Sequence, residues 1–133
     1  TGRLQRMIHV PGRLFSVAPY TVRQVPRLFA RNERVVSIFE NEHGPMAVVM
    51  VGAMLVSSMD TAWSGTVTPP RARRVQVGDW SRRDIHLEKG QEMGRFNMGS
   101  TVIVLLPAIA VAAVEHLEPD QPVLMGQRFG TLR

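Results

Sequence analysis

The chain has 133 residues, 44% of them apolar and 20% charged, which is typical of one globular domain and excludes wholesale disorder. Its 16 Lys and Arg against 11 Asp and Glu give a formal charge of +5, and a basic surface attracts nucleic acid, anionic membranes or acidic substrates without choosing among them. The chain has no cysteine, which excludes disulfides, thiolate metal sites and a cysteine nucleophile.

The first half of the chain predicts a β-hairpin that follows irregular segments. Residues 4–17 are apolar but contain a Pro-Gly pair, which predicts two short strands or one bent strand. Prolines recur across residues 19–31, so we expect a loop with at most one short turn there. Residues 34–40 are rich in β-branched side chains and residues 46–54 are continuously apolar. This pattern predicts two strands joined by a turn, the second of them buried on both faces.

The middle of the chain is less regular. Residues 55–64 are compatible with a strand or a loop, and residues 66–70 predict a strand that two prolines end. Residues 71–84 are rich in arginine and show no sustained period, which indicates a loop or a solvent-exposed hairpin.

The last third contains the strongest predicted strand, residues 101–106. Residues 108–115 mix alanine with valine and are compatible with helix or strand, and a last strand is expected near residues 123–125. The longest apolar run, residues 102–114, contains a proline and is shorter than the roughly 18 to 20 residues of a membrane-spanning helix. We therefore expect a mainly β fold, a sandwich or barrel-like core with few short helices.

The composition of the chain changes at Ser100. Residues 89–99 are polar and rich in glycine, and an apolar run starts directly after the serine. We therefore expect Ser100 at the start of a buried strand. Gly94 and Gly99 have the spacing of a phosphate-binding loop, but Ser100 stands where that loop needs a lysine. The residues leave open a turn at a strand start or a self-processing serine, since glycine adopts backbone angles that can bring the Gly99 carbonyl close to the hydroxyl.

The run KGQEMGRFNMGSTVI, residues 89–103, resembles the processing-site region of the phosphatidylserine decarboxylases. These are pyruvoyl enzymes in which the serine of a GST motif cuts its own chain and becomes the cofactor. Further segments resemble the same family in the same order: VPGRLFSV (10–17), VPRLFARNERV (25–35), GPMAVVMVGAMLV (44–56), WSGTVTPPR (63–71) and the weaker MGQ (125–127). The first of them resembles an interior part of the family, so we expect the chain to be a fragment of a larger domain.

The resemblance implies a reaction at the bond between Gly99 and Ser100. Ser100 is then the self-cleavage nucleophile and becomes a covalent pyruvoyl cofactor that forms a Schiff base with the substrate amine. Thr101 either orients the scissile peptide or only favours a strand. Residues 1–99 would belong to the larger (β) chain and residues 100–133 would form the smaller (α) chain, with the two chains remaining associated. The implied activity is that of a carboxy-lyase of phospholipid biosynthesis, which converts phosphatidylserine to phosphatidylethanolamine.

The resemblance also implies the setting of this reaction. Phosphatidylserine as substrate implies a peripheral position on a cell membrane, at its cytoplasmic face. We expect no nucleic acid and no metal as partner, because no nucleic-acid motif is present and His86-Leu87-Glu88 has only half of a zinc signature that needs cysteines. Two alternatives remain: a pyruvoyl decarboxylase of another amine-bearing acid, and a basic β-rich binding module without catalysis.

The family's processing base is a histidine supported by an aspartate, and both match positions upstream of residue 1. None of the four histidines here inherits that role. His9 is expected to be a partly packed side chain and His116 a solvated end of an element. The 133 residues alone are therefore expected to remain uncut and inactive.

Residues around the predicted cleavage site and the basic segment have less specific roles. Gly90 and Gly94 are expected to form turns, and Met93, Phe96 and Met98 are expected in the core, with contact to lipid acyl chains as the alternative. The densest basic group is Arg71, Arg73, Arg74, Arg82 and Arg83. These arginines predict either a solvated loop or contact with anionic head groups.

Overall fold

A computed structural model describes residues 1–56, 58–115 and 118–133, and the fold is mainly β. In chain order the elements are β1 (Gly2–Val10), α1 (Pro19–Gln24), α2 (Leu28–Arg31), β2 (Arg34–Asn41), β3 (Gly44–Val51), β4 (Met59–Thr61), β5 (Gly65–Thr68), β6 (Gln76–Asp79), β7 (His86–Leu87), β8 (Gly94–Phe96), β9 (Thr101–Leu105), the 3-10 helix η1 (Ala108–Ala110), β10 (Val111–Val114) and β11 (Gly130–Leu132).

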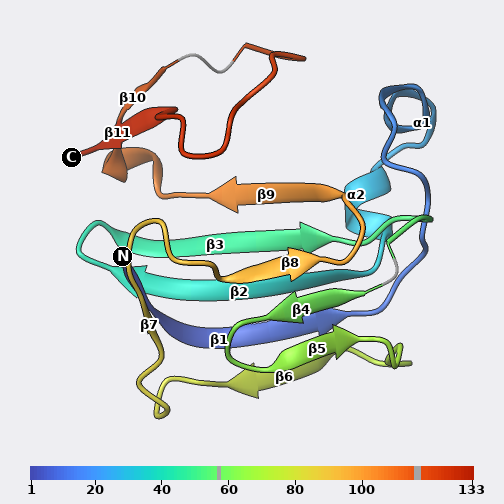
Figure 1. Ribbon diagram of the computed structural model, residues 1–133, viewed down its shortest axis with the longest axis horizontal. Coiled ribbons are helices and arrows are strands. Elements are labelled where there is room, and N and C mark those ends of the chain that lie inside the picture. The colour runs from blue at the N-terminus through green and yellow to red at the C-terminus, as the bar shows by residue number, and fades with distance from the viewer. Residues whose placement is uncertain (57, 116–117) are drawn as a thin grey trace.

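Six strands form one antiparallel sheet in the order β6-β1-β2-β3-β9, with β7 also paired to β1 (Figure 1). The predicted hairpin is confirmed as β2 and β3. Its turn closes at Gly44, whose φ of 100° suits glycine, and the side chain of Asn41 accepts a hydrogen bond from the main-chain N–H of His43 over 2.8 Å. Strand β3 is buried continuously only from Val48 to Val51.

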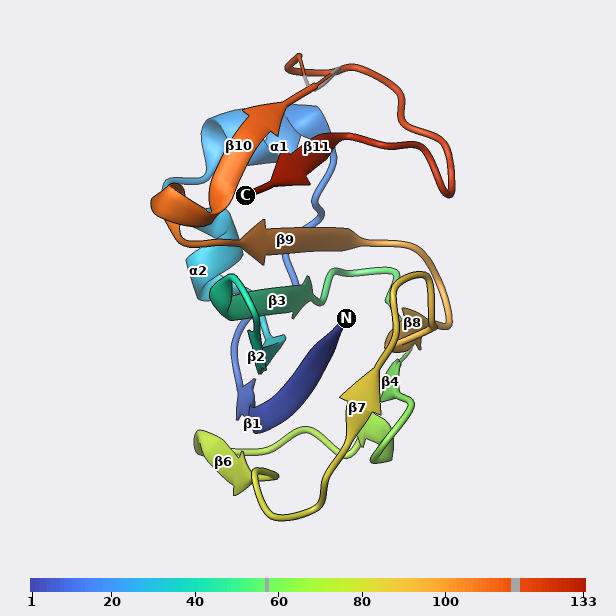
Figure 2. The same ribbon diagram turned by 90° about the vertical axis from the view of Figure 1, so that its left-hand side faces the viewer.

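The strands β5-β4-β8 form a second sheet that covers one face of the first (Figure 2). Side chains of both layers meet in a core that includes Val35 of β2, Met50 of β3 and Met59 of β4. A second cluster contains Phe39, whose ring meets the edge of Trp63 at 5.7 Å between centroids. The predicted sandwich is confirmed, but the sheets do not close, so the fold is not a barrel.

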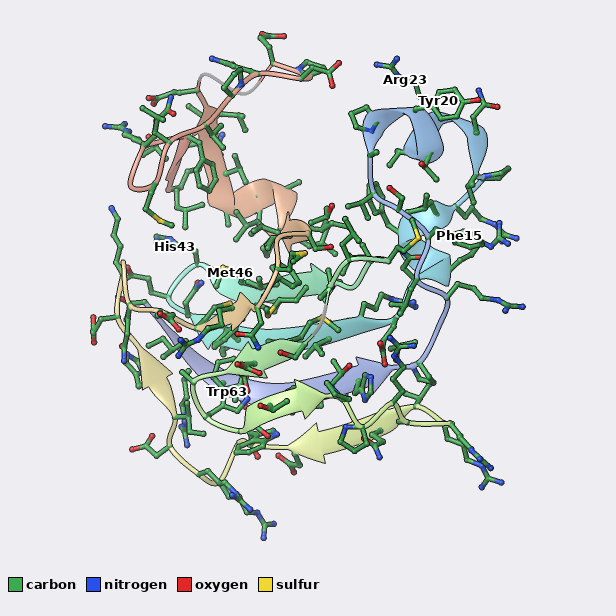
Figure 3. The ribbon with its side chains drawn as sticks, turned by 45° about the vertical axis from the view of Figure 1, so that its right-hand side comes forward. Phe15, Tyr20, Arg23, His43, Met46 and Trp63 are labelled. Atoms are coloured by element: carbon green, nitrogen blue, oxygen red, sulfur yellow. The ribbon has the colours of Figure 1, made fainter. Side chains whose placement is uncertain are left out.

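The loop predicted for residues 19–31 is wrong, because two short helices form there. Pro19 occupies the first turn of α1, where a missing N–H costs no helical hydrogen bond. α2 follows Arg27, whose left-handed φ of 55° turns the chain back toward the sheet and buries Leu28. Tyr20 and Arg23 project from α1 away from the sheets (Figure 3).

Residues 4–17 form one strand and an irregular segment, because β1 ends at Val10 before Pro11, which has no N–H to donate. The ambiguous residues 55–64 include β4, and the predicted strand at residues 66–70 is β5, which ends at Thr68. The expected loop at residues 71–84 contains β6, which pairs with the edge of β1.

The C-terminal segment forms a separate two-stranded sheet of β10 and β11. The ambiguous residues 108–115 contain η1 followed by β10. The strand predicted near residues 123–125 is wrong, because these residues lead into a turn at Gly126 with a φ of 79°, and the real last strand is β11. In the part of the chain that the structure describes, no helix has the length and apolar character to cross a membrane.

Candidate functional site at the start of β9

The predicted cleavage bond lies where the chain passes from the small sheet to the large one. β8 pairs with β4, residues 97–100 follow, and β9 then pairs with β3 (Figure 1). The register between β3 and β9 opposes Thr101 to Val51, so Ser100 stands just outside the first strand pair. The strand predicted at residues 101–106 is confirmed, apart from its last residue. The expectation that this strand is buried is wrong, because Val102, Val104 and Leu105 are exposed.

The hydroxyl of Ser100 donates a hydrogen bond to the main-chain carbonyl of Val51, with 2.5 Å between the two oxygens. Val51 is completely buried at the end of β3, and Ser100 itself is partly buried. A peptide carbonyl orients a hydroxyl but does not take its proton. The structure therefore holds the proposed nucleophile in one orientation and leaves proton removal to another group.

Gly99 is exposed, and a Cβ built on it would meet no atom within 4 Å. Among the described residues, glycines with positive φ are Gly44, Gly65, Gly90 and Gly126. Gly99 therefore does not use the left-handed backbone angles that motivated our expectation. Its missing side chain leaves the carbonyl carbon open to approach.

Asn97 fixes the chain just before Gly99. Its main-chain N–H donates to the carbonyl of Ser58 over 3.2 Å, and its side-chain amide donates to Oδ2 of Asp60 over 3.2 Å and to the hydroxyl of Ser58. The other carboxylate oxygen of Asp60 is buried, with no hydrogen-bond partner in the part of the chain that the structure describes. Sequence reasoning missed both residues, since a lone Asp after an apolar run and a lone Asn before a glycine form no motif.

The glycines and apolar residues before the site have divided roles. Gly90 has a φ of 83° and forms a turn as expected, whereas the turn expected at Gly94 is wrong. Gly94 lies in β8, where an added Cβ would stand 2.4 Å from the carbonyl oxygen of Asp60. Met93 and Phe96 pack against the core as expected, whereas Met98 is 54% exposed.

The structure places Thr101 as the first residue of β9, half-buried and opposite Val51. This position agrees with the strand-forming role that the sequence left open. The phosphate-loop alternative loses its remaining support, because such a loop leads into the N-terminus of a helix and this one leads into a strand.

His9 is buried rather than partly packed, and its Nε2 lies 2.9 Å from Oε1 of Glu33. The other oxygen of Glu33 lies 3.5 Å from the hydroxyl of Thr68 and 3.7 Å from Nε of Arg71. A buried acidic side chain needs such partners, because isolated burial of a charge is costly.

Of the remaining histidines, His43 is partly buried, His86 is exposed and His116 is outside the described residues. His43 lies 3.4 Å from Glu42, and His86 lies 3.7 Å from Glu88. His116 is outside the described residues, so its expected position is not tested. Across residues 1–56, 58–115 and 118–133, no three His, Asp or Glu side chains form a group that could hold a metal ion.

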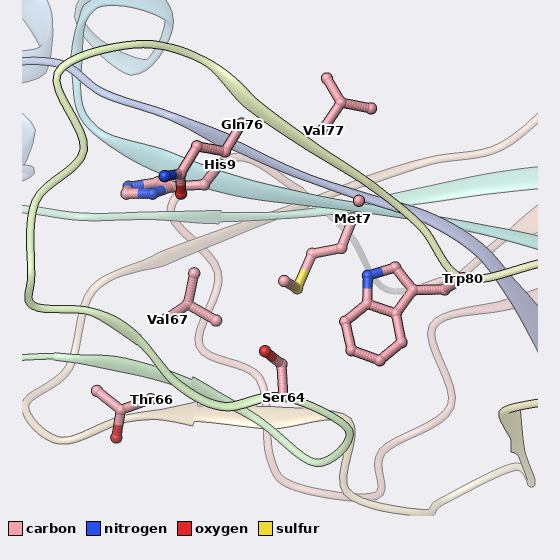
Figure 4. A pocket seen from close by; sticks show the side chains of 9 residues that line it. Met7, His9, Ser64, Thr66, Val67, Gln76, Val77 and Trp80 are labelled. Atoms are coloured by element: carbon pink, nitrogen blue, oxygen red, sulfur yellow. The ribbon is translucent and has the colours of Figure 1, made fainter. Parts of the chain in front are cut away.

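A cavity of about 310 Å³ lies beside β1 and does not include the cleavage site. Met7, His9, Val67, Gln76 and Trp80 are among its lining residues (Figure 4). Its walls are a mixture of apolar and polar side chains from β1, β5 and β6 and from the adjacent Ser64 and Trp80. Because neither Gly99 nor Ser100 lines it, the cavity does not belong to the site at β9.

The five arginines of the basic group are all exposed. Arg71 approaches Glu33, and the guanidinium of Arg83 lies 4.8 Å from the centroid of Trp80, a cation-π contact. Beside them, hydrogen bonds from the Ser81 hydroxyl and main-chain N–H hold the pKa of Asp79 below its usual value. The basic group is thus partly engaged within the protein.

Comparisons with known proteins show the family of the chain. A sequence model of the family described as phosphatidylserine decarboxylase matches residues 1–131. The chain is 53% identical over 132 residues to the phosphatidylserine decarboxylase proenzyme of Stutzerimonas stutzeri, covering 98% of this chain and 44% of that relative. It is 54% identical to the proenzymes of Photobacterium profundum, over 98% of this chain and 46% of the relative, and Bordetella pertussis, over 95% and 43%.

The chain thus spans about half the length of the curated relatives it matches. The family match extends across nearly all of its residues and includes both strands that frame the Gly99–Ser100 bond. The chain belongs to the phosphatidylserine decarboxylase family.

Proposed function

We propose that this chain carries the self-cleavage site of a phosphatidylserine decarboxylase proenzyme, which converts phosphatidylserine to phosphatidylethanolamine. The observation that carries the proposal is the position of Ser100. It follows an exposed glycine, precedes a paired strand and has its hydroxyl held by the carbonyl of Val51. The relatives named as proenzymes support a chain that is processed before it acts.

Self-cleavage starts with attack of Ser100 Oγ on the carbonyl carbon of Gly99. The bond between that carbon and the nitrogen of Ser100 breaks, the nitrogen gains a proton, and the peptide becomes an ester. A base then removes the α-proton of residue 100, and the bond between its Cβ and Oγ breaks. Oγ leaves with Gly99 as part of a carboxylate, and residue 100 becomes dehydroalanine. Water converts this end group to a pyruvoyl group and releases ammonia.

The residues present are compatible with a pyruvoyl group at position 100. The group is made from the side chain and main chain of Ser100, and the exposed Gly99 leaves room for the two new ends to separate. The main chain of β9 would hold it on one side, through the pairing of Thr101 with Val51. When present, the group supplies an electron-withdrawing carbonyl for the loss of carbon dioxide.

We further propose that the two products stay together after cleavage. β9 begins the smaller chain and pairs with β3 of the larger chain from Thr101 opposite Val51 to Leu105 opposite Ala47. On the other side of the bond, Asn97 ties the new end of the larger chain to β4. Each product therefore keeps its own anchor to the scaffold.

We place the enzyme at the cytoplasmic face of a cell membrane as a peripheral protein. Its proposed substrate is a membrane lipid, and the exposed arginines within residues 71–83 support contact with anionic head groups. This location is part of the proposal, as is phosphatidylserine as the substrate.

The test uses the full-length protein and its Ser100→Ala variant with vesicles that contain phosphatidylserine. We expect wild-type protein to release carbon dioxide and form phosphatidylethanolamine, and the variant to do neither. Activity only on a different amine-bearing acid would support the alternative decarboxylase. A wild-type protein that remains one uncut, inactive chain would support the binding module and contradict the proposal.

A further inference from the structure

One peptide unit joins the proposed nucleophile to the interior of the fold. The carbonyl of Val51 accepts the hydrogen bond from Ser100 at 2.5 Å, and the N–H of Gly52 in the same unit donates to the carbonyl of Glu33 over 2.8 Å. Because a peptide unit is planar, its C=O and N–H turn together. The position of the Glu33 carbonyl therefore sets the direction of the carbonyl that faces Ser100.

Asn32 fixes the carbonyl of Gly52, the residue that follows the end of β3. Its side chain is completely buried and donates two hydrogen bonds of 2.9 Å, to the carbonyls of Gly52 and Phe15. Its Oδ1 accepts a third from the N–H of Phe15 over 3.0 Å. Both amide hydrogens and the amide oxygen of Asn32 are thus bonded, and the side chain holds the carbonyl of Gly52 in place.

Glu33 is itself held from several directions. Its N–H donates to the carbonyl of Arg13 over 2.8 Å, and its buried carboxylate contacts His9 at 2.9 Å. Gly52 also fits tightly, since a Cβ there would stand 3.2 Å from the Glu33 carbonyl oxygen and 3.3 Å from Leu14. The corner formed by Asn32 and Glu33 therefore leaves the Val51–Gly52 peptide little freedom to rotate.

We propose that Asn32 is a positioning residue for self-cleavage, acting through the Val51–Gly52 peptide on the hydroxyl of Ser100. The inference rests on the proposed self-cleavage at Gly99–Ser100 and adds a specific residue to it. Asn32 touches neither reacting atom. Its role is to keep the acceptor of the Ser100 hydroxyl in place, so that the oxygen has one orientation before it attacks.

This role is confined to the first chemical step. Once residue 100 has become a pyruvoyl group, its hydroxyl is gone and the Val51 carbonyl has no nucleophile to orient. Loss of Asn32 is therefore expected to slow processing and to leave the decarboxylation rate per processed site unchanged. A change that only destabilised the fold would lower both.

The experiment follows self-cleavage of the full-length protein over time by intact mass. Asn32→Asp keeps the shape of the side chain but replaces its two donor bonds with repulsion between oxygens, and we expect cleavage to slow about tenfold or more. The control is Phe39→Leu. In the pair of β2 and β3, Phe39 lies opposite Met46 whereas Val51 lies opposite Arg34, so the control site is toward the other end of the pair from Val51. We expect the control to cleave within about threefold of wild type, even at an equal loss of melting temperature.

Two further readouts separate positioning from stability. Hydroxylamine cleaves esters, so hydroxylamine-dependent cleavage measures the first step, and we expect it to fall by the same factor as self-cleavage in Asn32→Asp. The processed fraction of the variant, counted by its pyruvoyl ends, is expected to decarboxylate substrate within about twofold of wild type per site. If Asn32→Asp does not fold, Gly52→Ala serves as the second variant, because its Cβ displaces the same peptide.

Three outcomes would overturn the inference: wild-type cleavage rates in both variants, equal slowing in the stability-matched control, or an equal fall in decarboxylation per site. Failure of the wild-type protein to cleave at all would instead refute the proposed function on which the inference rests. The two failures are therefore distinguishable in one set of measurements.

Discussion

The side-chain amide of Asn97 donates a hydrogen bond to Oδ2 of Asp60 over 3.2 Å, just upstream of the proposed cleavage bond. This contact connects the end of β8 to β4, while Ser100 is connected to the end of β3. The chain is therefore held by a hydrogen bond on each side of the bond between Gly99 and Ser100. Such an arrangement holds the reacting groups near each other before cleavage and holds the two new chain ends at separate anchors after it.

The contact between Asn97 and Asp60 gives a prediction about stability and processing. Asn97→Ala leaves the carboxylate of Asp60 without this donor, which is expected to cost about 1–2 kcal/mol of unfolding free energy. Urea unfolding in a Ser100→Ala background, where neither protein is cut, measures this cost. With Ser100 present, Asn97→Ala is expected to slow self-cleavage. An unchanged rate would show that the hydrogen bond between Asn97 and Asp60 is not needed for cleavage.

Gly94 and Gly99 are predicted to respond differently to the same substitution. Gly94→Ala forces a Cβ against the Asp60 carbonyl in the β4–β8 pair and is expected to cost about 1–3 kcal/mol. Gly99→Ala meets open space, so its unfolding free energy is expected to stay within about 0.5 kcal/mol of the parent.

These two stabilities are measured in the uncut Ser100→Ala background, and cleavage rates are measured with Ser100 present. Gly99→Ala is expected to slow cleavage without loss of stability, because its methyl group crowds the carbonyl that is attacked. A large stability loss at Gly99 would mean that the open surroundings of this residue are filled in the full-length protein.

The 133-residue chain by itself is predicted to remain uncut. The hydroxyl of Ser100 faces a peptide carbonyl, and the described histidines are engaged elsewhere, with His9 at Glu33 and His43 at Glu42. Intact mass spectrometry over several days measures this directly. Efficient cleavage at Gly99–Ser100 in the isolated chain would show that a base for this step lies within these residues.

The exposed arginines predict binding to anionic vesicles. Replacing Arg73 and Arg74 by glutamine removes two charges, which is expected to cost about 2 kcal/mol, or roughly a thirtyfold weaker affinity for vesicles with anionic lipid. Co-sedimentation at low and high salt measures the effect, and neutral vesicles give the baseline. The matched control replaces Arg23 and Arg133, which are also exposed. An equal loss in both double variants would indicate total charge rather than this segment.

The sequence was sufficient to predict the β2–β3 hairpin and the strand after Ser100, because each has a local pattern of apolar residues bounded by turn residues. The sequence was not sufficient where pairing with a strand distant in the chain decides whether a segment becomes a strand. β6 is a strand because it pairs with the edge of β1. The β-branched and apolar residues at 123–125 have no such partner among the residues that the structure describes, and they enter a turn at Gly126 instead.

The candidate site shows the same division. Ser100 and Gly99 could be found from a change in composition and a motif that resembles a family. Their surroundings could not be found in this way, since the acceptor of the Ser100 hydroxyl is the main-chain carbonyl of Val51. Every residue has such a carbonyl, so the residue type does not indicate this role. The roles of Asn32 and Asp60 likewise depend on which strands the fold places together.

Self-cleavage between Gly99 and Ser100 is tested most directly by the mass of the smaller chain from the full-length protein, mapped to its first residue. We expect a chain that begins at residue 100 and is lighter by one ammonia than the same chain with an intact amino-terminal serine. We also expect that Ser100→Ala yields no such chain. A smaller chain that begins with unmodified serine, or at any other residue, would contradict the formation of a pyruvoyl group by self-cleavage between Gly99 and Ser100.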